Sequence, residues 1–223
     1  MSIRKVSFIL GEFYHIYNRG NDKREIFHNR ADYSRFLKIL NLLNSCTTMS
    51  PRAIPGDFFI PNTKDKIVSI GCYCLLPNHF HLILKEIEEG GISRFMQKIT
   101  TSYAMYYNQK YKRTGSLFEG KFKSKHISDD RYFKYLFSYI HLNPVKLIEP
   151  KWKTEGIRDY KKALGYLEKY EHSSYRKYLK GEDEYSIVDN SAFPEYFPTK
   201  ESFKNEVFDW LNYGKEDLRY EGG

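Results

Sequence analysis

Two β-rich runs joined by only two residues constrain the fold of this chain more than any other feature. They are KIVSIGCYCLL at residues 66–76 and HFHLILKEI at residues 79–87, with Pro77 and Asn78 between them. β-Branched and aromatic residues favour strands, and a short connection of turn-forming residues favours a hairpin. The sequence therefore predicts an antiparallel strand pair, around which the rest of a sheet has to be built.

The other segments supply further strands and helices. Apolar residues recur at helical spacing in some of them and alternate as in strands in others. In chain order we predict a strand at 12–21, a helix at 31–45, a proline-containing loop at 46–64, a helix at 92–111, a strand at 121–127 and a helix at 129–142. The fold class that follows is α+β, with a mostly antiparallel sheet covered by helices.

The length of 223 residues fits one domain with an appendage better than two full domains. We predict a main domain over residues 1–150 and a C-terminal helical and irregular appendage over residues 151–223. No apolar run approaches the length of a membrane span, so we expect no membrane association and a cytoplasmic, nucleoid-associated protein. The cysteines Cys46, Cys72 and Cys74 are expected to be reduced, the last two as small buried hydrophobes.

Charge is unevenly distributed along the chain, although the total is +8. Residues 91–126 hold eight lysines and arginines and one acidic residue, whereas residues 181–223 hold eleven acidic and four basic residues. A basic segment in a basic protein favours a polyanionic partner, most commonly nucleic acid, and the alternative is a solvated helix face. The acidic end is either a surface appendage or a segment that folds over the basic groove, in which case truncation after Lys180 would strengthen DNA binding.

The second run of the hairpin carries two histidines, His79 and His81, among apolar residues. Residues two apart in a strand point to the same face and lie about 6.6 Å apart, so the imidazoles are neighbours while Phe80, Leu82 and Leu84 line the other face. Two imidazoles at that spacing can share a divalent cation, or they can form a hydrogen-bonded structural pair. The spacing leaves both interpretations open.

The helix predicted at 129–142 offers further polar groups. Tyr139 and Asn143 lie one helical turn apart beside its apolar stripe, whereas His141 points elsewhere. Pro144 disfavours helical geometry at Asn143, which makes this asparagine a helix-terminal residue. A phenol and a carboxamide can therefore face one site together, although ordinary packing and helix ending are alternatives.

Five motifs in order match one family pattern. They are FYHIYNRGN, PNHFHLIL, LFEGKFKS, YIHLNPVK and SSYRKYL, and they extend over roughly residues 12–180. On these motifs the chain resembles the single-tyrosine transposases of the HUH endonuclease superfamily, and more narrowly the REP-associated tyrosine transposases. The resemblance implies a ferredoxin-like α+β domain that nicks and rejoins single-stranded DNA bearing hairpins, such as REP-like sequences or transposon ends.

The resemblance also implies a role for each candidate site residue. His79, His81 and Asn143 correspond to metal ligands, with Mg²⁺ or Mn²⁺ as the cofactor, and Tyr139 corresponds to the nucleophile. The enzyme implied is a metal-dependent tyrosine DNA-strand transferase that forms a 5′-phosphotyrosine intermediate and a free 3′-OH. The family includes both monomers and homodimers, so the oligomeric state stays open.

Basic and aromatic residues near these motifs are candidates for DNA contact. For each of them the alternative is packing in the core or exposure on a solvated face. The candidates are Arg19, Lys23, Arg24, Lys98, Tyr107, Lys110, Tyr111, Lys112, Arg113, Lys121, Lys123 and Lys125.

Two other functions compete with strand transfer. A protein of the same fold that has lost catalysis would still bind structured DNA or RNA. A zinc-dependent hydrolase is disfavoured, because the sequence has neither an HExxH motif nor paired cysteines with zinc-ligand spacing.

Overall fold

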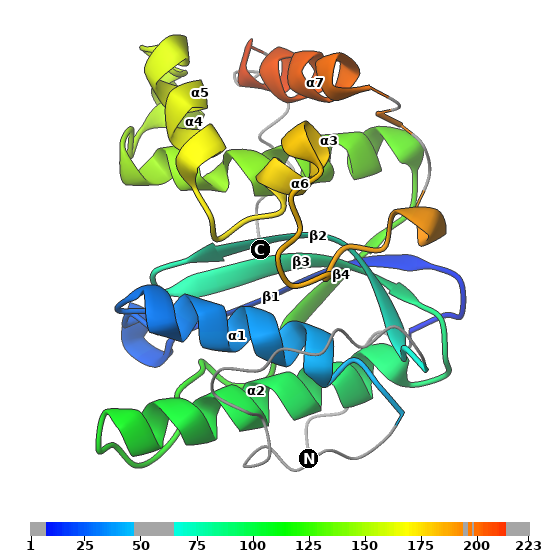
Figure 1. The fold of residues 1–223 in the computed structure, drawn as a ribbon, viewed down its shortest axis with the longest axis vertical. Coiled ribbons are helices and arrows are strands. Elements are labelled where there is room, and N and C mark those ends of the chain that lie inside the picture. Colours follow the sequence, from blue (N-terminus) through cyan, green and yellow to red (C-terminus); the bar gives the residue numbers. More distant parts are fainter. Residues whose placement is uncertain (1–7, 47–64, 194–195, 198, 213–223) are drawn as a thin grey trace.

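The computed structural model describes residues 8–46, 65–193, 196–197 and 199–212 (Figure 1). Within them the chain forms an antiparallel sheet with the strand order β2-β3-β1-β4. The strands are β1 (Phe13–Arg19), β2 (Val68–Leu76), β3 (His79–Glu86) and β4 (Lys123–Ile127). The predicted hairpin is formed by β2 and β3, in register from Val68 opposite Glu86 to Leu76 opposite His79. Apart from Cys46, the loop predicted at 46–64 lies outside the described residues.

Helices alternate with the strands as the sequence predicts. The order β1-α1-β2-β3-α2-β4, combined with the observed strand order, is the ferredoxin-like α+β arrangement, which confirms the expected fold class. The helices are α1 (Arg30–Leu42), α2 (Gly91–Lys110), α3 (Asp130–Leu142), α4 (Trp152–Glu155), α5 (Tyr160–Lys169), α6 (Tyr175–Lys180) and α7 (Lys200–Asn212). Short 3₁₀ turns are η1 (Asn21–Lys23), η3 (Asn143–Leu147) and η4 (Asn190–Ala192).

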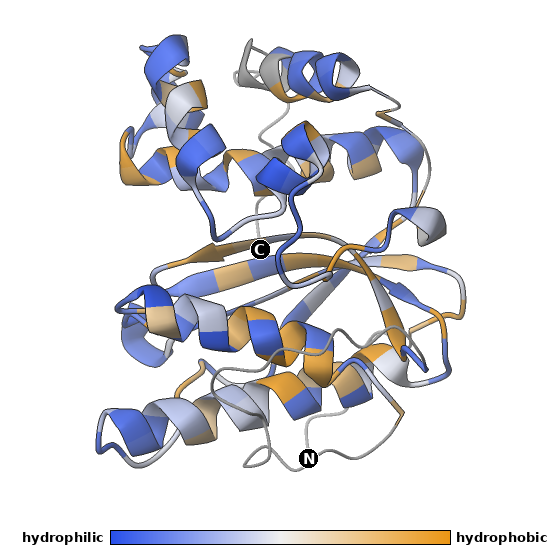
Figure 2. Ribbon diagram, in the orientation of Figure 1, coloured by the Kyte–Doolittle hydropathy of each residue, from blue (hydrophilic) through white to orange (hydrophobic). Residues whose placement is uncertain are grey.

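The sheet separates two hydrophobic cores. Helices α1 and α2 cover one face, and α3 to α7 form a layer over the other (Figure 1). Phe80 and Leu82 of β3 point into the α1–α2 core, whereas Ile83 belongs to the core beneath α3. Figure 2 shows hydrophobic residues along β2 and β3 and hydrophilic residues over much of the outer helices. Cys72 and Cys74 are free and fully buried in the second core, as predicted.

Local sequence signals explain where α3 begins and ends. The Asp129 side chain caps its first turn by accepting a hydrogen bond from the Tyr132 backbone N–H at 2.8 Å. At the other end Asn143 is the C-cap, so its predicted terminal position is confirmed. Its backbone nevertheless keeps helical angles, φ −52° and ψ −36°, because the chain continues directly into η3 with Pro144 in the first turn.

Residues after Pro150 pack onto the sheet and onto α3. Backbone hydrogen bonds join the outer edge of β2 to residues 172–174, including Leu75 N–H to the His172 carbonyl at 2.9 Å and Ser174 N–H to the Tyr73 carbonyl at 3.0 Å. Helix α7 contributes Phe203 and Val207 to the core beneath α3. The division into residues 1–150 and 151–223 stays a prediction.

Within the described part of the chain, none of the helices has both the length and the apolar character required to cross a bilayer.

Candidate active site

His79 and His81 lie side by side on the face of the sheet that α3 covers. Their ring centroids are 5.1 Å apart with an interplanar angle of 85°, while Phe80 between them is fully buried on the opposite face. The sheet register places Arg19 opposite His79 and Tyr17 opposite His81 on strand β1. Strand alternation therefore brings the two imidazoles together as the sequence predicts.

The turn before His79 is anchored by the loop that follows β1. The Pro77 carbonyl accepts hydrogen bonds from the backbone N–H groups of Ile26 and Phe27, at 2.7 and 3.0 Å. The Asn78 carbonyl accepts from Gly20 N–H at 2.8 Å, and the Asn78 amide donates to the Lys23 carbonyl at 3.2 Å. These bonds fix the start of β3 and thereby the position of His79.

The Nδ1 atom of each histidine has a hydrogen-bond partner. His79 Nδ1 lies 2.5 Å from Asn78 Oδ1, so it is the donor to that amide oxygen. His81 Nδ1 lies 2.9 Å from Nε2 of the buried His15 on β1. In each of the two histidines, Nε2 is therefore the ring nitrogen that can bind a cation. Metal-ligating histidines in proteins commonly have this arrangement, in which the second nitrogen is held by a hydrogen bond.

Burial keeps these histidines neutral. It lowers the pKa of His79 to about 4, with the charges of Lys146, Lys153 and Arg19 as further causes. Burial also lowers the pKa of His81 well below its ordinary value, and the neighbouring histidines and lysines add to that effect. Neutral imidazole is the form that binds metal ions. The pair therefore fits a divalent cation in charge state as well as in spacing.

Tyr139 of α3 lies above the histidine pair. Its ring centroid is 6.0 Å from that of His81, and its side chain is 7% exposed. The Lys153 ammonium donates a hydrogen bond to the Tyr139 phenolic oxygen, and its Nζ lies 4.1 Å from the ring centroid. Tyr135, one turn earlier on α3, stacks on Tyr139 with 6.0 Å between ring centroids.

Asn143 follows Tyr139 by one turn and is buried at the end of α3. Its Nδ2 donates a hydrogen bond to the Tyr139 backbone carbonyl at 3.1 Å. Because Nδ2 is engaged in this way, the side-chain oxygen is the atom able to ligate a hard cation such as Mg²⁺ or Mn²⁺. No set of three or more His, Cys, Asp and Glu side chains able to hold a metal occurs in the described residues, so a third ligand beside the histidine pair would have to be of another residue type, such as Asn143.

Three side chains of this site were not predicted from the sequence. They are His15, which contacts His81, and the lysines Lys146 and Lys153, whose charges act on both histidines. The alternation of β1 in FYHIYNR would have placed His15, Tyr17 and Arg19 on one face, but only the register of β1 against β3 shows which histidine they meet.

Several predicted DNA-contact residues lie on the same sheet face or beside the turn at Asn78. Lys121, Lys123 and Lys125 are exposed, and β4 pairs Lys123 with Tyr17 and Lys125 with His15. Arg19 forms a double hydrogen bond with Glu119, with 2.9 Å between Nη2 and Oε1. The exposed Lys23 and the half-buried Arg24 follow in the anchoring loop. These six side chains lie at the end of β1, in the loop after it and along and just before β4, and we name them the basic rim.

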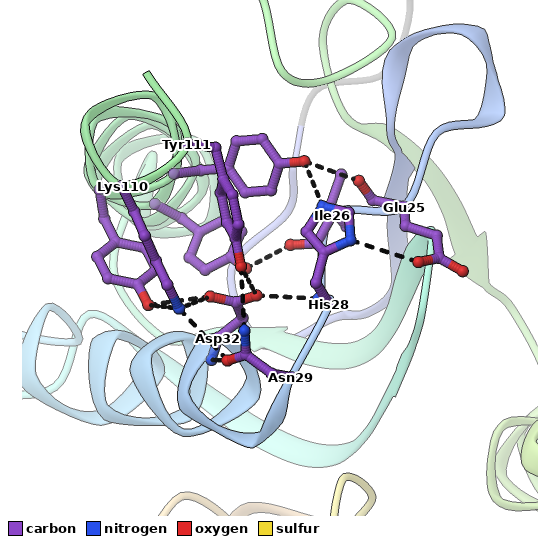
Figure 3. Close-up of polar contacts among 10 residues, drawn as sticks. Glu25, Ile26, His28, Asn29, Asp32, Lys110 and Tyr111 are labelled. Atoms are coloured by element: carbon purple, nitrogen blue, oxygen red, sulfur yellow. Dashed lines mark hydrogen bonds and ion pairs between the residues drawn. The ribbon is translucent and has the colours of Figure 1, made fainter. Parts of the chain in front are cut away.

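The predicted DNA-contact residues of α2 have other partners, shown in Figure 3. The Asp32 carboxylate of α1, which is fully buried, accepts from Lys110 Nζ at 2.6 Å and from the Tyr111 hydroxyl at 2.7 Å. Tyr107 is 3% exposed and donates to the Glu25 carbonyl, which argues against base stacking by this ring.

The remaining basic candidates of this region lie on or just after α2. Lys98 donates to the Ser45 carbonyl at 2.5 Å, Lys112 is exposed, and the Arg113 guanidinium lies 5.7 Å from the Tyr107 ring centroid. Since α2 covers the sheet face opposite the histidine pair, Lys98 is separated from the candidate site by the sheet.

Two comparisons found proteins to which this chain is similar. A family model described as "Transposase IS200 like" matches residues 55–143, which contain β2, β3, α2, β4, α3 and Asn143. A solved structure described as "Structure of the REP associates tyrosine transposase bound to a REP hairpin" is similar at a TM-score of 0.48 and 15% identity, over 88% of this chain and 99% of that one. No curated protein matches. Residues 55–143, which carry His79, His81, Tyr139 and Asn143, are thus similar to the family of IS200-like transposases.

Proposed function

We propose that the protein is a DNA-strand transferase that nicks and rejoins single-stranded DNA bearing hairpins. The observation that carries this proposal is the placement of the Tyr139 ring, whose centroid is 6.0 Å from that of His81, beside two neutral histidines whose Nε2 atoms remain for a cation. The hairpin substrate is inferred from the sequence resemblance, and the basic rim formed by Arg19, Lys23, Arg24, Lys121, Lys123 and Lys125 suits the phosphates of such a strand.

Tyr139 is the nucleophile in this proposal. Its phenolic oxygen attacks the scissile phosphorus, which produces a 5′-phosphotyrosine adduct and a free 3′-OH. The adduct retains the phosphate in ester linkage, so a second 3′-OH can attack it and join strands without ATP. His79, His81 and the Asn143 amide oxygen would hold Mg²⁺ or Mn²⁺. When bound, the cation would withdraw charge from a non-bridging phosphate oxygen.

The test mixes the protein with a 5′-labelled and a 3′-labelled hairpin oligonucleotide in Mn²⁺ or Mg²⁺ and looks for a denaturation-resistant adduct. We expect the adduct on the fragment 3′ to the nick, its loss in Tyr139→Phe, and its loss on chelation of the metal. Tyr135→Phe is the matched control, because it removes the same hydroxyl one turn away on α3.

The runner-up function, recognition of structured DNA or RNA without catalysis, predicts a different outcome. Tight hairpin binding with no adduct on any oligonucleotide would favour it and would contradict strand transfer. An adduct that persists in Tyr139→Phe would leave strand transfer standing but would assign the nucleophile to another residue.

A further inference from the structure

Lys153 reaches the proposed nucleophile from a part of the chain that the family match does not cover. It lies on α4, beyond Asn143, where the matched segment ends. Its ammonium donates to the phenolic oxygen of Tyr139 and also lies over the ring, 4.1 Å from the centroid. Because Tyr139 is 7% exposed and Lys153 is half-buried, this contact is partly shielded from water, and a charge acts more strongly there than on the open surface.

The chain between the two residues holds the lysine in place. Residues 145–156 run through successive turns in which the Val145 carbonyl accepts from Glu149 N–H at 2.8 Å and the Glu149 carbonyl accepts from Trp152 N–H at 3.1 Å. Trp152, the neighbour of Lys153, is buried in the core beneath α3. A buried anchor on one side of α4 thus directs the adjacent lysine toward Tyr139.

We propose that Lys153 is a catalytic residue that stabilises negative charge on the Tyr139 oxygen in both nicking and rejoining; this inference rests on the proposed function. A donor already aimed at an atom that becomes charged lowers the barrier without reorganisation. The ammonium form is the donor, so Lys153 does not remove the phenol proton.

The proton balance of the step follows from that assignment. The phenol of Tyr139 releases its proton to water, and the phenolate oxygen forms a bond to phosphorus. The bond from phosphorus to the 3′ oxygen breaks, its electron pair stays on that oxygen, and the oxygen takes a proton from water. In rejoining, a 3′-OH attacks the phosphotyrosine and releases its proton to water as its oxygen bonds to phosphorus. The bond from phosphorus to the Tyr139 oxygen breaks, and the phenolate leaves with the electron pair, hydrogen-bonded to the Lys153 ammonium, before it takes a proton from water.

The first measurement is the single-turnover rate of adduct formation on a saturating hairpin oligonucleotide in Mn²⁺. We expect Lys153→Met to slow it roughly 100-fold, as loss of a donor to a developing anion commonly does, and Lys153→Arg to keep most of the rate. Lys151→Met is the control: it removes the same charge two residues away, from a side chain that is 75% exposed and paired with Glu155. Rejoining, measured by adding a free 3′-OH strand to isolated adduct, should slow in parallel.

Two further measurements test whether Lys153 contributes to catalysis or only to packing. The deficit of Lys153→Met should shrink as pH rises, since bulk deprotonation then supplies the phenolate that the lysine otherwise favours. A single 3-fluorotyrosine at position 139, followed by fluorine NMR without DNA or metal, should ionise at higher pH in Lys153→Met than in the parent protein. The fluorine titration shows whether Lys153 favours the phenolate, and the rate deficit and its pH dependence show whether this effect contributes to catalysis.

The possible outcomes distinguish a failure of the proposed role of Lys153 from a failure of the proposed strand-transfer function. If the parent protein forms a Tyr139-dependent adduct and Lys153→Met matches it in rate, pH profile and fluorine titration, the role of Lys153 is wrong and strand transfer stands. If the parent protein forms no adduct, the proposed function fails; the fluorine titration then still tells whether Lys153 favours the phenolate.

Discussion

His15 holds a proposed metal ligand through one buried hydrogen bond. Its Nε2 lies 2.9 Å from His81 Nδ1, and its ring stacks against those of Tyr17 and His81, with centroid distances of 4.8 and 5.1 Å. If His81 gives its Nε2 lone pair to a cation, its Nδ1 carries the proton and donates to His15. Outer partners of this kind fix the tautomer and the orientation of a ligating ring.

We therefore predict that His15→Phe, which retains ring packing and removes the acceptor, lowers the affinity for Mn²⁺ about tenfold. Titration calorimetry of the DNA-free protein measures this directly. His126→Phe is the control, because His126 lies on the opposite face of the sheet, next to Tyr14, where its Nε2 contacts Glu12 at 2.9 Å. Equal Mn²⁺ affinity in His15→Phe and the parent protein would contradict the positioning role.

At the scale of elements, the buried Asp32 carboxylate ties α1 to α2. Burial by itself would raise the pKa of Asp32, but donors from Lys110, Tyr111, the His28 backbone and Tyr106 lower it below its ordinary value. Replacing a buried carboxylate that has these partners lowers the free energy of unfolding, because each hydrogen-bond donor would lose its acceptor.

Asp32→Asn should lower the free energy of unfolding by about 2–3 kcal/mol at pH 7, as measured by urea denaturation. Because the folded-state pKa is lowered, the ionised Asp32 stabilises the fold above its ordinary titration range, and this contribution is lost as pH falls through the folded value. The difference in the free energy of unfolding between the parent protein and Asp32→Asn should therefore become smaller in acid. The control is Asp22→Asn, at an exposed ion pair with Arg24, which should change the free energy of unfolding little. Equal losses of unfolding free energy in Asp32→Asn and Asp22→Asn would contradict a special role of the buried carboxylate.

The same elements show what the sequence can and cannot reveal. Periodicity alone placed His79 and His81 on one strand face and Tyr139 and Asn143 on one helix flank. It could not show that Lys110 and Tyr111 bind Asp32, because this contact joins two helices far apart in the chain. Lys153 was missed for a similar reason: nothing in the pattern after Pro150 indicates that α4 turns back toward α3.

At the scale of the whole molecule, the exposed lysines of β4 should govern the salt dependence of DNA binding. Each lysine that contacts a phosphate of single-stranded DNA contributes about 0.7 to the slope of log affinity against log salt. Replacing Lys121, Lys123 and Lys125 together by Gln should reduce that slope by about 2 if all three make such contacts, as measured by fluorescence anisotropy over a salt series. The matched control replaces three exposed lysines of α5, Lys161, Lys162 and Lys169, and should leave the slope near its parent value.

The acidic end of the chain is partly built into the core. Phe203 and Val207 of α7 are buried in the same hydrophobic core as the apolar residues of α3. Truncation after Lys180 removes both side chains, so a change in DNA binding by that variant would mix lost charge with lost packing. Whether the acidic end competes with DNA is better tested by neutralising Glu201 and Asp209, which are exposed on α7.

The hydrogen bonds between β2 and residues 172–174 also bear on how the edges of the sheet are protected. An open edge strand presents unpaired backbone groups to which another chain can add as an extra strand. At β2 this edge is occupied from within, since Leu75 and Tyr73 are bonded to His172 and Ser174. At β4, the other edge, alternating lysines repel an incoming strand. The sheet is thereby protected against aggregation at both ends, and at β4 the residues that deter another protein chain are also the ones that suit a nucleic acid.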